Sequence, residues 1–133
     1  MKTKLSATAL LAGATLLAGC ASSFHGSYLV GQRYFKTNID TQPVIILGVD
    51  NWDTVERRVL VEPGEHVIRV QAMPVPGAPN ETGELKLDVK PCFTYYLVAV
   101  RENRIAANFA TRVDYAEPLG GCTPVPPAKK SAG

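Results

Sequence analysis

The chain has 133 residues, of which 46% are hydrophobic and 20% charged, and its formal net charge is +2 at pH 7. Two of its 14 basic residues, Lys2 and Lys4, precede the first apolar run, and the other 12 balance the 12 acidic residues. A near-neutral chain has no long-range field for recruiting nucleic acid, so we expect no nucleic-acid partner. Its length and ordinary apolar content predict a single globular domain.

The N-terminus is organised like a secretory signal peptide. Lys2 and Lys4 precede an apolar run of 14 residues, Leu5 to Ala18, and small residues close the segment. Signal peptides have an apolar region of about 7–15 residues. As a helix, this run would extend roughly 21 Å, which falls short of the roughly 30 Å hydrocarbon core of a bilayer. We therefore expect a cleaved export signal and no membrane-spanning helix in the mature chain.

The residues Leu17-Ala18-Gly19-Cys20 resemble the lipobox of bacterial lipoproteins. The resemblance implies cleavage before Cys20, a thioether-linked diacylglycerol on its sulfur and an acyl chain on its new amino group. Stable anchoring takes more than one acyl chain, and three would exceed that requirement. Ala21 follows the cysteine where an Asp would resemble an inner-membrane retention signal. The resemblance therefore implies an outer-membrane anchor, with the folded domain in the periplasm.

Alternating apolar residues predict strands in the rest of the chain. Residues 84–90 alternate strictly, residues 66–72 place Ile68, Val70 and Ala72 on one parity, and residues 54–61 alternate with Arg57 as the exception. Residues 43–49 and 93–100 are apolar on both parities, which is typical of central strands covered on both faces.

Turn residues separate these runs. Asp50-Asn51 ends one strand, Pro63-Gly64 predicts a hairpin, and the stretch 74–83 predicts a long exposed loop. A short helical turn fits residues 101–110, but a hairpin there fits better. Strands at this spacing indicate an all-β protein, a small antiparallel β-sandwich.

The segment Arg57 to Val70 is similar to the central hairpin of PEGA-like β-domains, with Gly64, His66, Ile68 and Val70 at the matching positions. The resemblance implies a β-sandwich that serves as a scaffolding or interaction module, and it carries no catalytic residues. Together with the lipobox, it divides the chain into a signal peptide (1–19), an acylated tether (20–26), a β-sandwich domain (27–122) and a disordered Pro-rich tail (123–133).

Two cysteines remain once Cys20 is acylated. Cys92 and Cys122 form an even pair in an oxidising compartment, which favours a disulfide, and two buried thiols are the alternative. A bridge of this span contributes about 3–4 kcal/mol on the chain-entropy model.

The remaining candidates for a site are few. Trp52 is a possible binding aromatic or a core anchor, and Arg101, Arg104 and Tyr115 form a possible patch for a glycan, phosphate or protein, or else a solvated rim. The histidines, His25 and His66, do not supply a metal site, and Asp50, Asp53 and Glu56 fit a solvated turn. We therefore expect no metal, cofactor or catalytic activity.

These observations lead to one functional hypothesis and two rivals. The first is a non-enzymatic lipoprotein, held in the membrane through Cys20, whose domain contacts an envelope protein. The second is a lipoprotein that binds a glycan or small ligand. The third, an enzyme built on Asp50, Asp53 or His66, has the least support.

Overall fold

The structure, a computed structural model, describes residues 25–74, 76–77, 80–103 and 105–124. The predicted signal peptide, Cys20 and most of the predicted tail lie outside these ranges. Within them the protein is all-β, as predicted, and no helix there is long and apolar enough to cross a membrane. The strands are β1 (Ser27–Val30), β2 (Thr41–Val49), β3 (Trp52–Glu56), β4 (Arg58–Val61), β5 (Gly64–Ala72), β6 (Thr82–Val89), β7 (Phe93–Val100) and β8 (Ala110–Pro118).

The strands form one hydrogen-bonded sheet that folds into two layers. Its order is β4-β1-β7-β2-β5-β6, with β8 paired to β7 and β3 paired to β2. Residues 41–43 of β2 pair with β7, whereas residues 44–49 pair with β5, so β2 passes from one layer into the other. All pairs are antiparallel except β1–β7, so the sheet is mixed rather than purely antiparallel.

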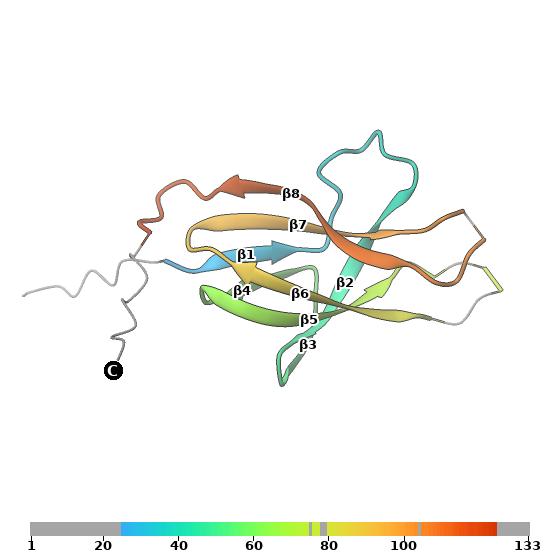
Figure 1. The fold of residues 1–133 in the computed structure, drawn as a ribbon, viewed down its shortest axis with the longest axis horizontal. Helices are drawn as coiled ribbons and strands as arrows, with labels where there is room; N and C mark the ends of the chain where they lie inside the picture. Colours follow the sequence, from blue (N-terminus) through green and yellow to red (C-terminus); the bar gives the residue numbers. More distant parts are fainter. Residues whose placement is uncertain (1–24, 75, 78–79, 104, 125–133) are drawn as a thin grey trace, which may run out of the picture.

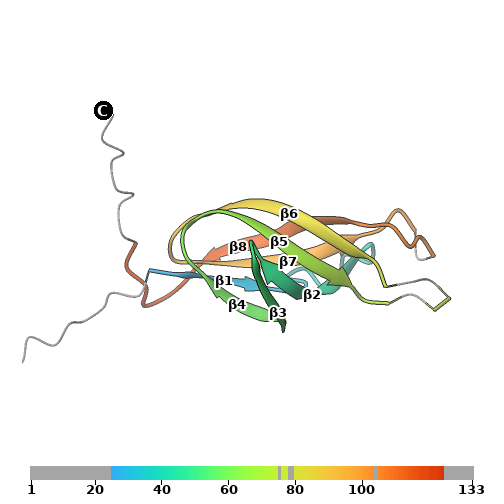
Figure 2. The ribbon, with the colours of Figure 1, turned by 90° about the horizontal axis from the view of Figure 1, so that it is seen from below.

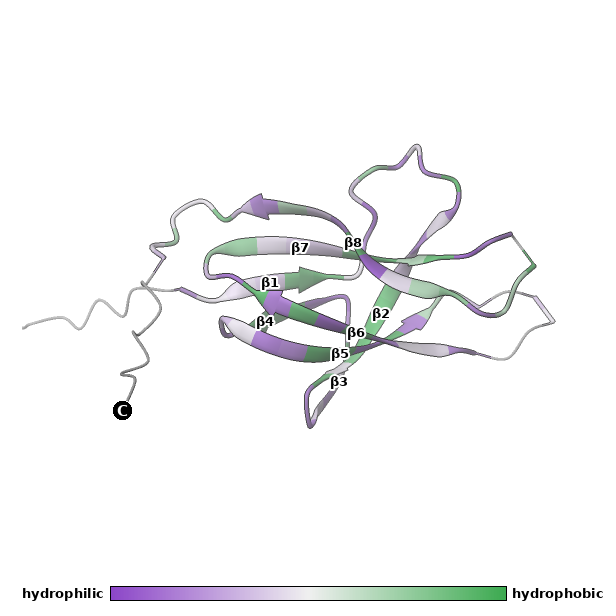
Figure 3. Cartoon of the chain, in the orientation of Figure 1, coloured by the Kyte–Doolittle hydropathy of each residue, from purple (hydrophilic) through white to green (hydrophobic). Residues whose placement is uncertain are grey.

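The core lies between the layers, which makes the fold sandwich-like. One layer contributes Leu29, Val59 and Leu97, and the other contributes Ile46 and Ile68, all of them buried. Hydrophobic colour runs along much of β2 and alternates with hydrophilic colour on β5 and β6 (Figure 3). The alternation predicted for residues 66–72 and 84–90 is confirmed by this arrangement.

Arg57 marks a break in the run that the sequence predicted as one strand. β3 ends at Glu56 and pairs with β2, whereas β4 begins at Arg58 and pairs with β1. The Arg57 carbonyl accepts a hydrogen bond of 2.7 Å from the Gly31 amide at the end of β1. Val55, which precedes the break, is 76% exposed, so its shared parity with buried Val59 has no packing significance.

The hairpin predicted at Pro63-Gly64 is wrong. β4 pairs with β1, and β5 pairs with β2 and β6, so Pro63 and Gly64 carry the chain between layers. Gly64 has a φ of 135°, a conformation that favours glycine. The chain does change direction at Pro63-Gly64, but the residues of a turn do not specify whether the strands on either side of it pair with each other.

The other predicted connections are confirmed. Asp50 and Asn51 join β2 to β3, residues 73–81 join β5 to β6, and residues 101–109 join β7 to β8 as a hairpin. The body is elongated, with the last two connections at one end and the start of β1 at the other (Figure 1, Figure 2).

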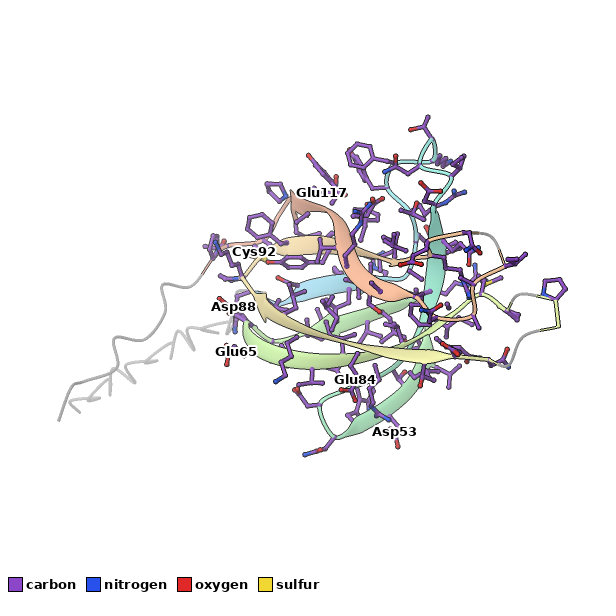
Figure 4. All side chains as sticks on the ribbon, turned by 45° about the vertical axis from the view of Figure 1, so that its right-hand side comes forward. Asp53, Glu65, Glu84, Asp88, Cys92 and Glu117 are labelled. Carbon is purple, nitrogen blue, oxygen red and sulfur yellow. A yellow bond between two sulfur atoms is a disulfide. The ribbon has the colours of Figure 1, made fainter. Side chains whose placement is uncertain are left out.

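The predicted disulfide is present. Cys92 and Cys122 are bonded, with their Cα atoms 5.5 Å apart, a normal separation for a bridge. Cys92 precedes β7 and Cys122 follows β8, so the bond closes the open end of the β7–β8 pair. Figure 4 labels Cys92 at the end of the domain opposite to the 101–109 connection.

Candidate functional site: an aromatic cluster beside an arginine-lined groove

The site begins with the face of β7 that points away from the core. Tyr95 and Leu97 belong to the core cluster, so Tyr96, which lies between them, points outward. The β7–β8 register places Tyr115 directly opposite Tyr96. The two tyrosines therefore form a cross-strand pair on the outer surface of the domain.

A β-bulge in β8 positions the side chain that holds the β1–β2 connection on this surface. The register changes from Tyr96↔Tyr115 to Leu97↔Val113, which leaves Asp114 as the extra residue. The Asp114 carboxylate accepts hydrogen bonds from the backbone amides of Tyr34 and Phe35, at 2.9 and 3.0 Å. The bulge thus fastens the β1–β2 connection across the outer face, where the 31–40 segment rises beside β8 (Figure 1).

This contact brings four aromatic rings together into the aromatic cluster, which consists of Tyr34, Phe35, Tyr96 and Tyr115. The Tyr34 and Tyr115 rings stack with centroids 4.1 Å apart, and Tyr34 meets Tyr96 edge-on at 5.1 Å. Phe35 contacts both Tyr34 and Tyr115 edge-on. Although the rings pack against one another, Tyr34, Phe35 and Tyr115 are 41%, 44% and 38% exposed. The cluster is an ordered apolar surface rather than a set of buried core rings.

A groove of about 420 Å³, the arginine groove, adjoins the cluster at Tyr96. Arg58 lies with its guanidinium carbon 3.9 Å from the centre of the Tyr28 ring, a cation–π contact that orients it. The Tyr96 hydroxyl donates a 2.7 Å hydrogen bond to Glu117, and this bond, together with burial, raises the pKa of Tyr96. Glu117 lies near the end of β8 (Figure 4). The groove is lined by Val30, Gln32, Arg57, Arg58, Thr94, Tyr96, Glu117 and Leu119.

The structure separates the residues that the sequence suggested as a site. Tyr115 lies in the aromatic cluster, whereas Trp52 is 57% exposed on the β2–β3 hairpin, which projects from the other side of the domain (Figure 1). Arg104 and Cys20 lie outside the described residues. Trp52 and Tyr115 therefore do not belong to one surface.

Arg101 is part of the framework and not a solvated rim residue. Its residue exposure is 6%, and its guanidinium donates to Gln42 Oε1 at 3.1 Å and to the Ala107 and Met73 carbonyls at 2.8 and 3.1 Å. It also donates to the carbonyl of Ala106. These bonds tie the end of β7 to β2, to the β5–β6 connection and to the β7–β8 connection.

His66 and Asp50 form a second polar contact, the histidine clasp. His66 Nδ1 lies 2.7 Å from Asp50 Oδ2, and Nε2 lies 2.7 Å from the Glu62 carbonyl oxygen. Asp50 Oδ1 also accepts a 2.9 Å hydrogen bond from the Val67 amide. Both ring nitrogens are thus engaged by the fold, which suits a structural clasp better than a general base.

No group of three or more His, Cys, Asp or Glu side chains in the described part of the chain could hold a metal ion. Comparison of the chain with protein-family models, with curated proteins and with solved structures gave no match. The resemblances to lipoproteins and to PEGA-like domains therefore stay predictions, and the site has to be interpreted from its own chemistry.

Sequence reasoning identified Tyr115 but missed the residues that make it part of a site. Tyr34 and Phe35 stand side by side in a mostly polar stretch of the β1–β2 connection, and this pair was the available signal. Asp114 gave no signal of its own, because a bulge depends on the register of two strands. Arg57 was interpreted as an exception within a strand and Arg58 was not singled out, so neither was predicted to line a groove.

Proposed function

We propose that the protein is a non-enzymatic, lipid-anchored envelope protein whose domain binds a protein partner through the aromatic cluster and the arginine groove. The lipobox-like Leu17–Cys20 segment supports the anchor and, with it, a periplasmic position at the outer membrane. The observation that carries the binding function is the exposed aromatic cluster, which Asp114 holds in place.

The chemistry of the surface indicates the character of the partner. Arg57 and Arg58 line the groove with Glu117, so two cations face one carboxylate, which is already engaged by Tyr96. Ordered aromatic rings beside arginines are the residue types most often found at the energetic centre of protein interfaces. The fitting partner presents apolar side chains to the cluster and carboxylates to the groove.

A photo-crosslinking side chain placed in living cells at Phe35 or Tyr115 tests the binding function. Both positions should yield the same crosslinked protein, and the same probe at Trp52 should not, because Trp52 projects from another side. Arg57→Glu should weaken the crosslink at both positions, while Arg112→Glu, on the same face but outside the groove, should change it less. An unchanged yield with Arg57→Glu, or different proteins from the two positions, would contradict the proposal.

A glycan is the second candidate, because the groove also offers the Gln32 amide, the Thr94 hydroxyl and the Tyr96 hydroxyl next to aromatic rings. Recovery of glycan alone from the same two probes would favour this alternative.

Anchoring is tested separately. Labelled palmitate should be incorporated into the wild-type chain and lost with Cys20→Ser. Equal labelling of both chains would show that Cys20 is not the attachment point.

A further inference from the structure

A second hollow lies at the end of the domain where Cys92 and Cys122 are joined. It encloses about 630 Å³, and its lining is mainly apolar, because prolines, Val89 and Phe93 dominate it. Gly64 has open space where a side chain would stand, so this residue also leaves the hollow open. The full lining, called here the apolar end, is Pro63, Gly64, Asp88, Val89, Lys90, Pro91, Phe93 and Pro124.

The apolar end is built from connections that cross between the layers. Residues 62–63 lead from β4 to β5, and residues 90–92 lead from β6 to β7. Ser27 Oγ donates to the Lys90 carbonyl at 2.6 Å and accepts a 3.0 Å bond from the Phe93 amide. These two bonds fix the start of β1 beside the hollow. The chain thus enters the domain at its apolar end.

The position of that entry relates the hollow to the membrane. Gly26 lies six positions after Cys20, and six extended residues span at most about 20 Å. If Cys20 is acylated, as the proposed function requires, the apolar end lies within about 20 Å of the bilayer. The 101–109 connection lies at the opposite end of the domain, separated from the apolar end by the length of β7 (Figure 1).

We propose that the apolar end rests on the lipid bilayer and that its hollow receives phospholipid acyl chains. An apolar patch with a polar rim marks a membrane or protein contact, and the short tether favours the membrane. The rim charges, Asp88 and Lys90, offset each other, so apolar burial and not charge attraction drives the contact. Because the anchor already confines the domain near the bilayer, even a weak contact is populated. The contact would orient the domain with the 101–109 connection directed away from the membrane.

Quenching by brominated lipids tests this orientation. Trp52 is the only tryptophan, so Trp52→Phe gives a silent background for Pro91→Trp at the apolar end and Ile105→Trp at the far end. The full acylated chains are reconstituted into vesicles of phosphatidylethanolamine and phosphatidylglycerol, with or without bromine on the acyl chains. Interfacial contacts place apolar groups about 5–10 Å into the headgroup boundary, so the fluorescence of Pro91→Trp should fall by about half or more. That of Ile105→Trp should not change.

A second probe and two further measurements separate the possible failures. Lys90→Trp, at an exposed position of the same rim, replaces Pro91→Trp if the latter fails to fold, and it should be quenched as well. Two measurements show whether the chain is anchored: its sedimentation with the vesicles, and the mass of the peptide that contains Cys20, which reveals the acyl chains. If the chains are acylated and sediment with the vesicles but neither rim position is quenched, the bilayer contact is wrong and the anchor still stands. The same result is expected if the hollow binds a protein rather than lipid. Unacylated chains that stay in the supernatant would overturn both this proposal and the anchor.

Discussion

His66, near the start of β5, contacts Asp50 in the β2–β3 turn and the Glu62 carbonyl just before β5. Its pKa depends on opposing effects. Burial of the ring lowers the pKa, but the hydrogen bonds to the Asp50 carboxylate and the Glu62 carbonyl, with the charges of these residues, outweigh burial and raise it above 6.5. The pKa of Asp50 is lowered from 3.8, first by the Val67 amide and then by His66. The clasp is therefore strongest when His66 is protonated and Asp50 is ionised.

The protonation of His66 makes stability depend on pH. A group whose pKa is raised by folding adds stability below its unfolded pKa, and that stability is lost as the pH rises through the folded pKa. We expect the melting temperature to fall by about 2–4 °C between pH 5.5 and pH 8, which is the size expected for a partly exposed pair. His66→Gln should remove most of this fall, as measured by thermal unfolding followed by circular dichroism.

His25→Gln is the matched control, because His25 is the other histidine and its contact, with Glu62 at 3.5 Å, is more exposed. The control should keep the pH dependence of the wild type. If the pH dependence of the melting temperature survived in His66→Gln and disappeared in His25→Gln, the effect would belong to His25 and the prediction would be wrong. Below pH 4 the wild type should lose stability for a separate reason: a carboxyl group whose pKa is lowered by folding adds stability above its unfolded pKa, and this stability is lost as the pH falls through the folded pKa of Asp50.

At the scale of elements, the bulge in β8 decides where the β1–β2 connection lies. Asp114 is the extra residue of the bulge, and its carboxylate is a charged acceptor for two backbone amides. Such bonds are stronger than bonds between neutral groups. Without them, the aromatic cluster would keep the Tyr96–Tyr115 pair but lose the support of Tyr34 and Phe35.

Replacement of Asp114 by alanine should free the segment that carries Tyr34 and Phe35. We expect the amide hydrogens of these two residues to exchange faster by about tenfold, and the free energy of unfolding to fall by about 1–2 kcal/mol. Hydrogen exchange followed by mass spectrometry or NMR measures the first effect, and urea unfolding measures the second. Glu117→Gln, three residues further along β8, should leave the exchange of both amides unchanged. If Asp114→Ala also left it unchanged, the bulge would not be what holds the segment.

For the whole molecule, the sequence predicted what depends on local pattern. The alternation at residues 84–90, the apolar runs at 43–49 and 93–100, and the hairpin at 101–110 all follow from side-chain direction and turn chemistry. The sequence failed where the fold depends on which strand pairs with which. Arg57 separates two strands, and Pro63-Gly64 joins two layers, because β1, far away in the sequence, takes β4 as its partner.

The candidate site followed the same rule. Tyr115 was predictable as an aromatic on a strand, and the Cys92–Cys122 pair followed from the cysteine count. The arginine groove was not predictable, because its walls come from β1, β4, β7 and β8 and meet only after long-range pairing. Arg101 was misjudged for a related reason: its guanidinium bonds Gln42 and Met73, which are distant in the sequence, as well as carbonyls of the connection that follows it, and composition indicates none of these contacts.

The disulfide joins this long-range framework where β7 begins and where the chain leaves β8. Its two cysteines are 30 residues apart, and a crosslink of that span removes about 3–4 kcal/mol of chain entropy from the unfolded state. The Leu119 amide donates a 2.8 Å hydrogen bond to the Cys92 carbonyl, so the paired strands keep one contact here even without the bond. The variant with Cys92→Ser and Cys122→Ser should therefore fold, with its free energy of unfolding in urea lowered by about 3–4 kcal/mol. Both proteins carry Cys20→Ser, so that reductant acts only on this pair, and in reductant their unfolding curves should coincide. Equal midpoints without reductant would mean that the bond does not stabilise the fold.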